Sequence, residues 1–250
     1  MNIDINEKIF IAGSTGMVGS SIKRILLKRL LNKKNGSKIL CPNRKELDLS
    51  NYEKVNKWFK ENKPSIVIIA AAKVGGILAN STMPYEFLLE NIKIQNNIIE
   101  NSWKYGAKKV LFLGSSCIYP KFSQQPIKEE YLLDSKLEET NQWYAIAKIT
   151  GIKLCESLAN QYSFDAISLM PSNLYGIGDN YNLSTSHVLP AFINRFQNAK
   201  DNNLKEVTCW GTGNALREFL YVDDLAEACI YSLEKWSTLN ENAPLDKDNK

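Results

Sequence analysis

The sequence predicts an α/β protein built on a doubly wound parallel sheet, with a smaller domain after it. Three observations lead to this prediction. Short β-rich runs alternate with helical segments along the first 170 residues. A glycine-rich turn directly follows the first of these runs. The length of 250 residues accommodates a domain of about 150 residues plus a smaller one. We therefore expect one domain over residues 1–170 and a second over residues 171–250.

The first domain alternates strands and helices in a regular order. Lys8–Ala12 is a short β-rich run, and from Val18 onward apolar residues recur at helical spacing. Further strands are expected at Lys38–Cys41, Ser65–Ala71, Lys109–Leu113 and Asp165–Met170. Helices are expected between them at Asn51–Asn62, Met83–Tyr105 and Asn141–Gln161. Strands separated by helices indicate βαβ units, and therefore a parallel sheet with helices on both faces.

The pattern becomes looser after Pro171. His187–Asn198 is expected to be helical, and Glu206–Trp210 and Arg217–Tyr221 are expected to be short strands. Asp223 is a candidate cap for a helix that runs to Trp236. We expect this second part to lie beside the sheet.

Composition excludes several classes of protein. Hydrophobic residues make up 44% and charged residues 23% of the chain, as in a folded protein rather than a disordered one. Residues 23–38 hold seven basic side chains and no acidic one, which favours a solvated helix face over a nucleic-acid or membrane patch. The longest apolar run, Ile66–Ala72, is too short to span a membrane. We therefore expect no nucleic-acid partner and no membrane partner.

Cysteine and histidine usage points to a reducing compartment without structural metal. The five cysteines are scattered and odd in number, and the single histidine leaves no set of zinc ligands. The polar start, Met1–Glu7, lacks the features of a signal peptide. We expect no metal and a cytoplasmic location.

The glycine-rich turn carries the first functional signal. Glycine provides the unusual φ of the turn, lets the backbone approach a pyrophosphate closely, and lets helix and strand touch. Amide groups at the start of the helix then face the anion. This pattern predicts a dinucleotide site and makes the fold Rossmann-type. The residues expected to bind are Gly13, Ser14, Thr15, Gly16, Met17, Val18 and Gly19.

The end of the second strand favours one dinucleotide over the other. An NAD-specific site usually has an acidic residue there to bind the ribose hydroxyls. This chain instead has Arg44, and the first acid that follows is Glu46. An arginine can pair with a 2′-phosphate, so the sequence favours NADP. The alternative is that Arg44 simply points into water.

Tyr144 and Lys148 form a second signal. A spacing of four puts both side chains on one face of the predicted helix. A nearby ammonium favours the phenolate, so we expect the pKa of Tyr144 to fall toward neutral pH. Such a tyrosine exchanges a proton with a carbonyl or hydroxyl oxygen while a hydride moves to or from the same carbon. With Ser115 and Ser116 at the end of the fourth strand, the pattern predicts a redox site at the carboxyl edge of the sheet.

At this point the chain resembles the extended short-chain dehydrogenases that modify nucleotide sugars, which belong to the NAD-dependent epimerase/dehydratase family. Within that group it resembles the GDP-L-fucose synthases most closely. The resemblance covers roughly residues 7–236. It rests on the segments Ala70–Gly76, Leu113–Pro120, Tyr144–Ile149, Pro171–Gly176, Ser186–Pro190 and Arg217–Asp224.

The resemblance implies conversion of GDP-4-keto-6-deoxy-D-mannose to GDP-L-fucose with NADPH. C3 and C5 both neighbour the C4 ketone, so their protons are acidified, and inversion needs a base and an acid on opposite sides of the sugar. The resemblance makes Cys117 the base and His187 the acid. It implies that Tyr144 protonates the C4 oxygen, supported by Ser115 and Lys148. A thiolate base implies cationic surroundings and a lowered pKa of Cys117.

The resemblance also implies the remaining contacts. Additional NADP(H) contacts are expected from Leu113, Gly114, Ser115, Ser116, Lys148, Pro171, Ser172, Asn173, Leu174 and His187. Substrate contacts are expected from Arg195, Trp210 and Arg217. Members of this family form homodimers and are longer than this chain, so we expect a homodimer with a truncated substrate domain.

Other interpretations remain open. The chain is alternatively a nucleotide-sugar 4-epimerase or dehydratase that retains its cofactor through the cycle, or a cofactor-binding remnant without turnover. Free cysteines are usually buried as small hydrophobes, and lone histidines usually lie on the surface. Trp210 is alternatively part of an ordinary core.

Overall fold

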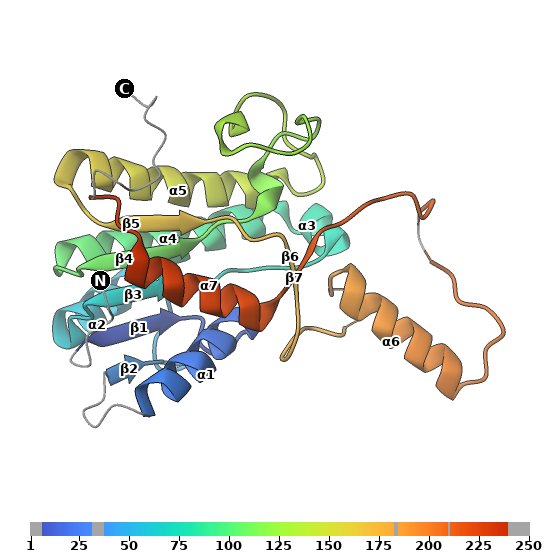
Figure 1. Ribbon diagram of the computed structural model, residues 1–250, viewed down its shortest axis with the longest axis horizontal. Coiled ribbons are helices and arrows are strands. Elements are labelled where there is room, and N and C mark those ends of the chain that lie inside the picture. Colours follow the sequence, from blue (N-terminus) through green and yellow to red (C-terminus); the bar gives the residue numbers. More distant parts are fainter. Residues whose placement is uncertain (1–6, 32–37, 183–184, 210, 240–250) are drawn as a thin grey trace.

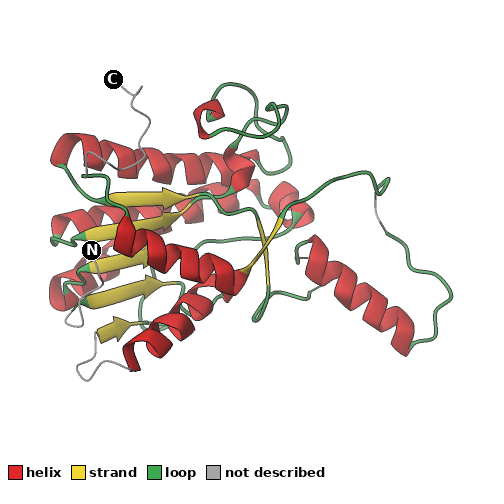
Figure 2. Ribbon diagram, viewed as in Figure 1, coloured by secondary structure: helices red, strands yellow, loops and turns green. Residues whose placement is uncertain are grey.

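The computed structural model describes residues 7–31, 38–182, 185–209 and 211–239. Five parallel strands form the central sheet in the order β2-β1-β3-β4-β5. They are β1 (Lys8–Ala12), β2 (Lys38–Leu40), β3 (Ile66–Ile69), β4 (Lys109–Leu113) and β5 (Ala166–Leu169). Figure 2 shows this sheet between two layers of helices, which confirms the predicted doubly wound α/β fold. The strand order reverses between β1 and β3, the place where open sheets of this type bind ligands.

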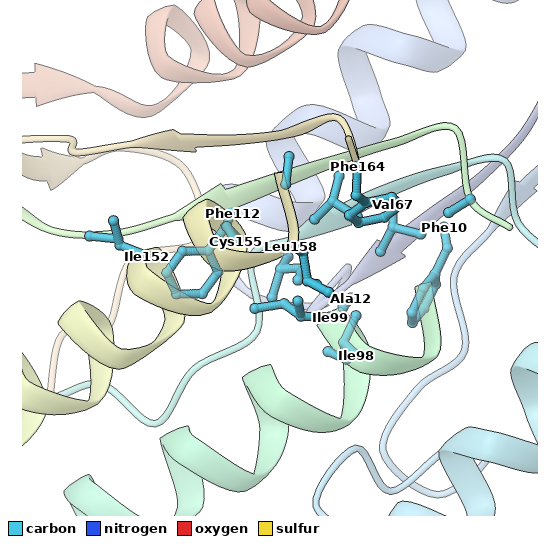
Figure 3. Packing of buried hydrophobic residues seen from close by; sticks show 14 of the residues in the cluster. Phe10, Ala12, Val67, Ile98, Ile99, Phe112, Ile152, Cys155, Leu158 and Phe164 are labelled. Atoms are coloured by element: carbon cyan, nitrogen blue, oxygen red, sulfur yellow. The ribbon is translucent and has the colours of Figure 1, made fainter. Parts of the chain in front are cut away.

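One face of the sheet is covered by three helices. These are α2 (Tyr52–Asn62), α4 (Pro84–Lys104) and α5 (Gln142–Tyr162). Alternate strand residues point to this face, among them Phe10, Val67 and Phe112. Figure 3 shows them packed with Ile98 and Ile99 of α4 and with Ile152, Cys155 and Leu158 of α5. Cys155 is thus a core residue. The apolar periodicity of the sequence located all three helices to within one residue.

The opposite face is covered by α1 (Met17–Leu31) and α7 (Val222–Lys235), which lie side by side. Ile9 and Ile11 of β1 contact a cluster that includes Ile22 of α1 and Ile230 of α7. Helix α7 comes from residues expected to lie in the second domain, yet it packs against the first sheet. The division of the chain at residue 170 into two domains remains a prediction.

Polar contacts fix both ends of α7. Tyr221 is its N-cap, so the prediction that Asp223 caps this helix is wrong. Asp223 lies in the first turn, where it accepts a 2.5 Å hydrogen bond from Ser21 Oγ and pairs with Arg24 of α1. At the other end, Nζ of buried Lys109 donates to the carbonyl oxygens of Leu233, at 3.0 Å, and Trp236.

A second, two-stranded sheet lies beyond the carboxyl ends of the main strands. Parallel strands β6 (Asn173–Tyr175) and β7 (Phe219–Tyr221) form it. The remaining elements are α3 (Ile77–Thr82), the 3₁₀ turns η1 (Ser116–Ile118) and η2 (Glu129–Tyr131), and α6 (Val188–Asp201). Figure 1 shows α6 set apart from the two helical layers, on the side toward which the strands point.

The predictions from the sequence were least accurate in this region. The strand expected at Glu206–Trp210 is wrong, because residues 206–209 are irregular, and Trp210 lies outside the described residues. No strand was expected directly after Pro171, but Asn173 and Leu174 belong to β6. A three-residue strand that pairs with a partner about 45 positions later has no local periodicity to reveal it. No helix within the described ranges is long and apolar enough to cross a membrane.

Candidate functional site

The glycine-rich turn lies where β1 and β3 end beside each other. Ala70 N donates a 3.0 Å hydrogen bond to Ala12 O, which keeps the two strand ends together. Gly13 has a φ of +83°, and a Cβ there would lie 2.7 Å from the backbone nitrogen of Ala71. A Cβ on Gly19 would lie 2.2 Å from the carbonyl oxygen of Gly13. These two glycines are therefore required by the close approach of the turn to β3 and to α1.

Gly16 is different, because the protein itself leaves room beside it. A Cβ on Gly16 would lie 3.5 Å from the nearest backbone atom, and the residue is exposed. Thr15 is also exposed, whereas Ser14 is buried. Met17 and Val18 begin α1, whose first N–H groups have no partners within the helix. The open side of Gly16 and the start of α1 together form an anion cradle that fits the pyrophosphate of a dinucleotide.

Arg44 lies in a tight turn after β2. The Asn43 side chain accepts hydrogen bonds from the backbone N–H groups of Lys45, at 2.9 Å, and Glu46, at 3.2 Å. The Glu46 carboxylate accepts a 2.7 Å bond from Asn43 N in return. This reciprocal capping leaves Arg44 exposed at the end of the sheet that carries the glycine turn. Its contact with a 2′-phosphate remains a prediction.

The end of β4 and one face of α5 bring four of the predicted catalytic residues together. Lys148 is buried, and its Nζ donates a 2.7 Å hydrogen bond to the carbonyl oxygen of Leu113. The same Nζ lies 5.7 Å from the ring centroid of Tyr144. Ser115 caps η1, and its Oγ accepts a 3.4 Å hydrogen bond from Cys117 N. A negative charge on Cys117 raises the pKa of both Tyr144 and Lys148, and the charge on Lys148 lowers the pKa of Cys117, as expected for neighbours.

Burial controls the acidity of this cluster. It raises the pKa of Tyr144 well above its usual range, and a negative charge on Cys117 raises it further. It also raises the pKa of the Cys117 thiol, although the Ser115 hydroxyl and the charge on Lys148 oppose this. Burial lowers the pKa of Lys148 to about 8. The lowered pKa values expected for Tyr144 and Cys117 are therefore wrong, because desolvation outweighs the effect of the neighbouring ammonium.

The two segments expected beside the nicotinamide lie next to each other. Gly114 N donates a 2.8 Å hydrogen bond to Leu169 O, and Ser116 N donates a 3.1 Å bond to Pro171 O. Leu113–Ser116 therefore runs alongside the segment that leads from Pro171 through Ser172 into β6. Asn173 is exposed and donates from Nδ2 to Glu218 O at 2.9 Å, which ties it to the start of β7.

His187 belongs to a second group of residues, at the start of α6. It is the exposed N-cap residue of α6 and comes directly after Ser186. Gly76 N donates a 3.0 Å hydrogen bond to Thr185 O, and a Cβ on Gly76 would lie 2.6 Å from Ser186 O. The glycine pair after β3 thus allows the chain before His187 to approach the sheet.

Sequence reasoning missed two residues that support the site. The edge of the Phe87 ring faces Tyr144, with centroids 6.5 Å apart. Buried Asn91 accepts a 2.7 Å hydrogen bond from Lys73 N and donates a 3.0 Å bond to Lys73 O. The available signal for Asn91 was an amide in the middle of an apolar helical pattern. Phe87 had no such signal, because an aromatic residue on a helix normally indicates core.

The predicted substrate residues are spread over separate segments. Arg195 lies on α6, and its Nη1 donates a 3.2 Å hydrogen bond to Thr208 O. Arg217 is exposed just before β7, and its Nη1 donates to Leu216 O at 2.7 Å. Trp210 lies outside the described residues. The substrate role of all three remains a prediction.

Comparison with known proteins agrees with this geometry. Residues 9–243 match the model of the NAD dependent epimerase/dehydratase family. The chain is 52% identical to GDP-L-fucose synthase 1 of Arabidopsis thaliana over 94% of its own length and 72% of that protein. It is 48% identical to GDP-L-fucose synthase of Escherichia coli, over 91% and 70%. The crystal structure of a GDP-L-fucose synthetase from Naegleria fowleri bound to NADP superposes with a TM-score of 0.82 at 28% identity, over 94% and 75%.

Proposed function

The chain belongs to the NAD dependent epimerase/dehydratase family, and from this premise we propose that it converts GDP-4-keto-6-deoxy-D-mannose to GDP-L-fucose. The reaction inverts C3 and C5 and then reduces C4 with NADPH. One observation carries the proposal: at the end of β4, Nζ of buried Lys148 lies 5.7 Å from the ring centroid of Tyr144 and donates to Leu113 O, two residues before Ser115. The GDP-L-fucose synthases at about half identity support the choice of substrate.

Epimerisation uses Cys117 as the base. The C4 ketone acidifies the protons on C3 and C5, and the thiolate removes one of them to leave an enolate. Lys148 favours this thiolate, since its positive charge lowers the pKa of Cys117 while the negative charge on Cys117 raises the pKa of Lys148. The two charges therefore stabilise each other. His187, the N-cap residue of α6, returns a proton to the other face of the carbon.

Reduction uses Tyr144 as the acid. NADPH, when bound, supplies the hydride that goes to C4. Tyr144 donates its proton to the C4 oxygen, and the raised pKa of its phenol keeps that proton in place until the oxygen becomes basic. Ser115 and Lys148 hold the tyrosine and the ketone oxygen in position.

The residues present fit NADP(H). The open side of exposed Gly16 and the amides at the start of α1 cradle the pyrophosphate. Arg44 binds the 2′-phosphate as an exposed cation beside the adenosine end. Lys148 binds the nicotinamide ribose. The segments Leu113–Ser116 and Pro171–Leu174 line the nicotinamide, and His187 lies near it. The NADP-bound relative supports the choice of cofactor.

The proposal includes a homodimer formed through α4 and α5. Trp103 and Tyr162 lie on these neighbouring helices with ring centroids 4.6 Å apart, and both are partly exposed, at 38% and 50%. A paired aromatic surface of this kind is typical of an interface. Light scattering after size-exclusion chromatography measures the assembly directly, and a monomer at micromolar concentration contradicts this part of the proposal.

Incubation with GDP-4-keto-6-deoxy-D-mannose and NADPH in D₂O tests the reaction. We expect one NADPH oxidised per product, with deuterium at C3 and C5 and GDP-L-fucose as the product identified by NMR. Turnover without net oxidation of NADPH indicates an enzyme that retains its cofactor and contradicts the proposal. Binding of NADPH without turnover indicates a cofactor-binding remnant, which also contradicts it.

A further inference from the structure

The ammonium of Lys148 lies over the ring of a core residue, Phe112. Its Nζ is 4.8 Å from the centroid of that ring. Lys148 is 4% exposed, and its Nζ donates a 2.7 Å hydrogen bond to Leu113 O. One carbonyl replaces little of the water around an ammonium, so the buried charge needs further stabilisation. An aromatic face within about 6 Å attracts a cation, most strongly where water is excluded. The ring of Phe112 therefore provides what the single carbonyl does not.

The packing of β4 against α5 fixes the ring in this place. Phe112 directly precedes Leu113 in β4, so adjacent residues of one strand supply the ring and the carbonyl. Phe112 is fully buried, and Figure 3 shows it packed with Ile152 of α5. A Cβ on Gly151 would lie 2.5 Å from Phe112 Cζ, so a side chain there would displace the ring. Gly151 lies on the same face of α5 as Lys148, three residues earlier. One turn of the helix thus holds the edge of the ring, and the turn before it places the ammonium over the face.

A contact from α4 fixes the same part of α5. Gln95 is buried, and its Nε2 donates a 2.6 Å hydrogen bond to the carbonyl oxygen of Ala147, the residue before Lys148. A Cβ on Gly151 would also lie 3.0 Å from Gln95 Cδ. This part of the helix is therefore held against both α4 and β4, and the position of the ammonium over the ring follows from that packing.

The thiol of Cys117, on η1, is the ionisable neighbour whose charge acts on Lys148. Burial lowers the pKa of Lys148 to about 8, and a negative charge on Cys117 opposes this effect. Tyr144, on α5 itself, keeps its proton near neutral pH, because burial raises the pKa of its phenol. Besides its hydrogen bond to the β4 carbonyl, the ammonium is thus favoured by the thiolate and by the ring of Phe112.

The surrounding elements carry further charged residues, most of which are paired or exposed. Strand β5 has no charged residue, and the one on β4 is Lys109, at the start of the strand, which pairs with Asp165 at 3.4 Å. Lys153 and Glu156 of α5 pair with each other at 2.7 Å on its exposed side. On α4 they are Glu86 in the first turn, Glu90, which pairs with Lys73, and the exposed residues Lys93, Glu100 and Lys104.

We propose that Phe112 is a positioning residue for Lys148, and that the face of its ring stabilises the buried ammonium and holds it between β4 and Tyr144. A ring face attracts the charge without taking a directed hydrogen bond, so N–H groups of the ammonium can still turn toward other acceptors. The consequence for catalysis rests on the proposed function, in which Lys148 favours the Cys117 thiolate and binds the nicotinamide ribose. Phe112 acts through Lys148 and needs no contact with sugar or cofactor.

A titration of Lys148 tests the proposal without any turnover. In protein labelled with ¹⁵N-lysine, NMR follows the Nζ signal of Lys148, which its absence in Lys148→Met identifies. We expect a midpoint near pH 8 in the wild-type protein, well below that of exposed lysines. Replacing Phe112 by a phenylalanine with two meta fluorines withdraws negative charge from the ring face and leaves the shape of the ring almost unchanged. This change is expected to lower the midpoint by about half a pH unit, and a single meta fluorine by about half as much.

Phe59 provides the matched control. It is fully buried in the same core cluster, but it lies on α2, where its ring contacts Phe10 and Trp58. The same fluorinated residues at this position are expected to leave the Lys148 midpoint unchanged. Phe112→Leu removes the ring and is expected to lower the midpoint further; if this variant does not fold, the fluorinated series decides alone. A midpoint that fluorination of Phe112 does not move, or that fluorination of Phe59 moves equally, overturns the proposal.

Activity provides the second readout. Exchange at C3 and C5 requires the charged form of Lys148 in the proposed function, so its ratio to the wild-type rate should fall as the pH passes the NMR midpoint. With two fluorines on Phe112, we expect a rate about twofold below wild type at pH 8 and close to wild type at pH 6. A rate lowered by the same factor at every pH indicates a role in packing alone and contradicts the proposal. If wild-type protein shows no turnover, the proposed function fails, and the NMR titration still decides whether Phe112 stabilises the ammonium.

Discussion

The Nζ of Lys148 donates a 2.7 Å hydrogen bond to the carbonyl oxygen of Leu113, the last residue of β4. This bond joins α5 to the strand end from which Ser115 and Cys117 follow. It also holds an ammonium in a buried place, where desolvation lowers its pKa to about 8. This cluster of residues is therefore assembled at the expense of stability.

Lys148→Met is expected to stabilise the protein at pH 7. The lysine has a higher pKa in the unfolded chain than in the folded one, so folding is opposed below pH 8 and this penalty disappears as the pH rises from about 8 toward 10.5. Allowing for the lost hydrogen bond, we expect a gain of about 1–3 kcal/mol in unfolding free energy at pH 7. Urea unfolding at pH 7 and pH 10 measures it. Lys153→Met on the exposed side of α5 is the control, and equal shifts in both variants contradict the prediction.

Cys117→Ser is expected to slow the exchange of the C3 and C5 protons by about 100-fold or more, because a hydroxyl is a far weaker base than a thiolate. Hydride transfer to an already epimerised ketone should change much less. Deuterium incorporation and NADPH oxidation measure the two steps separately. Exposed Cys209 supplies the control variant Cys209→Ser. Equal losses in both steps indicate a structural role for Cys117.

Tyr144→Phe is expected to give the opposite result. The ring still fills its place beside Phe87, but the C4 oxygen loses its proton donor. Reduction should fall by about 10²- to 10⁴-fold while exchange at C3 and C5 continues. Tyr85→Phe, at a phenol that is 69% exposed, serves as the control. Loss of exchange together with reduction contradicts the separation of roles.

Gly16→Ala and Gly19→Ala are expected to affect different properties: the first lowers NADPH affinity and the second lowers stability. A Cβ on Gly19 meets the carbonyl oxygen of Gly13 at 2.2 Å, so the fold should lose about 2 kcal/mol or more. A Cβ on Gly16 has room at 3.5 Å, so unfolding should change by less than about 1 kcal/mol. NADPH affinity should nevertheless fall about tenfold or more. Urea unfolding and fluorescence titration with NADPH measure both effects, and unchanged NADPH affinity in Gly16→Ala argues against the pyrophosphate cradle.

Arg44→Gln is expected to raise the Kd for NADPH about tenfold and to leave the Kd for NADH unchanged, because one of the cations facing the 2′-phosphate is removed. The effect should shrink at high salt. The neighbouring variant Lys45→Gln is the matched control. Equal weakening of both cofactors shows that Arg44 does not read the 2′-phosphate.

Local patterns predicted most of the first sheet and its helices, because each strand is continuous and apolar and each long helix has a regular apolar stripe. They failed where the determining contact is remote. Strand β6 exists because β7 pairs with it, and α7 covers the first sheet although the chain between them leads away. The pKa directions of Cys117 and Tyr144 failed for a related reason, since spacing reveals the nearby ammonium but not the depth of burial.

The residues that support the site were also hard to predict, because their contacts join segments far apart in the sequence. Sequence motifs located Ser115, Tyr144 and Lys148 together, because strand ends and helical spacing are readable from the chain. The close approach of Gly76 to Ser186 depends on how two loops meet. Neither loop has a periodic pattern.

The position of α7 changes how the chain can be divided. The polypeptide leaves the sheet after β5 and returns to cover it from Val222 onward, with Lys109 anchoring the far end of the returning helix. The segment between β5 and α7 is therefore an insertion attached to the sheet at both ends, rather than an appendage. A fragment ending at residue 170 would lack α7 and would uncover the part of this apolar face against which α7 packs. A minimal form of the first domain would instead need β5 joined directly to α7, so that α7 still covers the sheet.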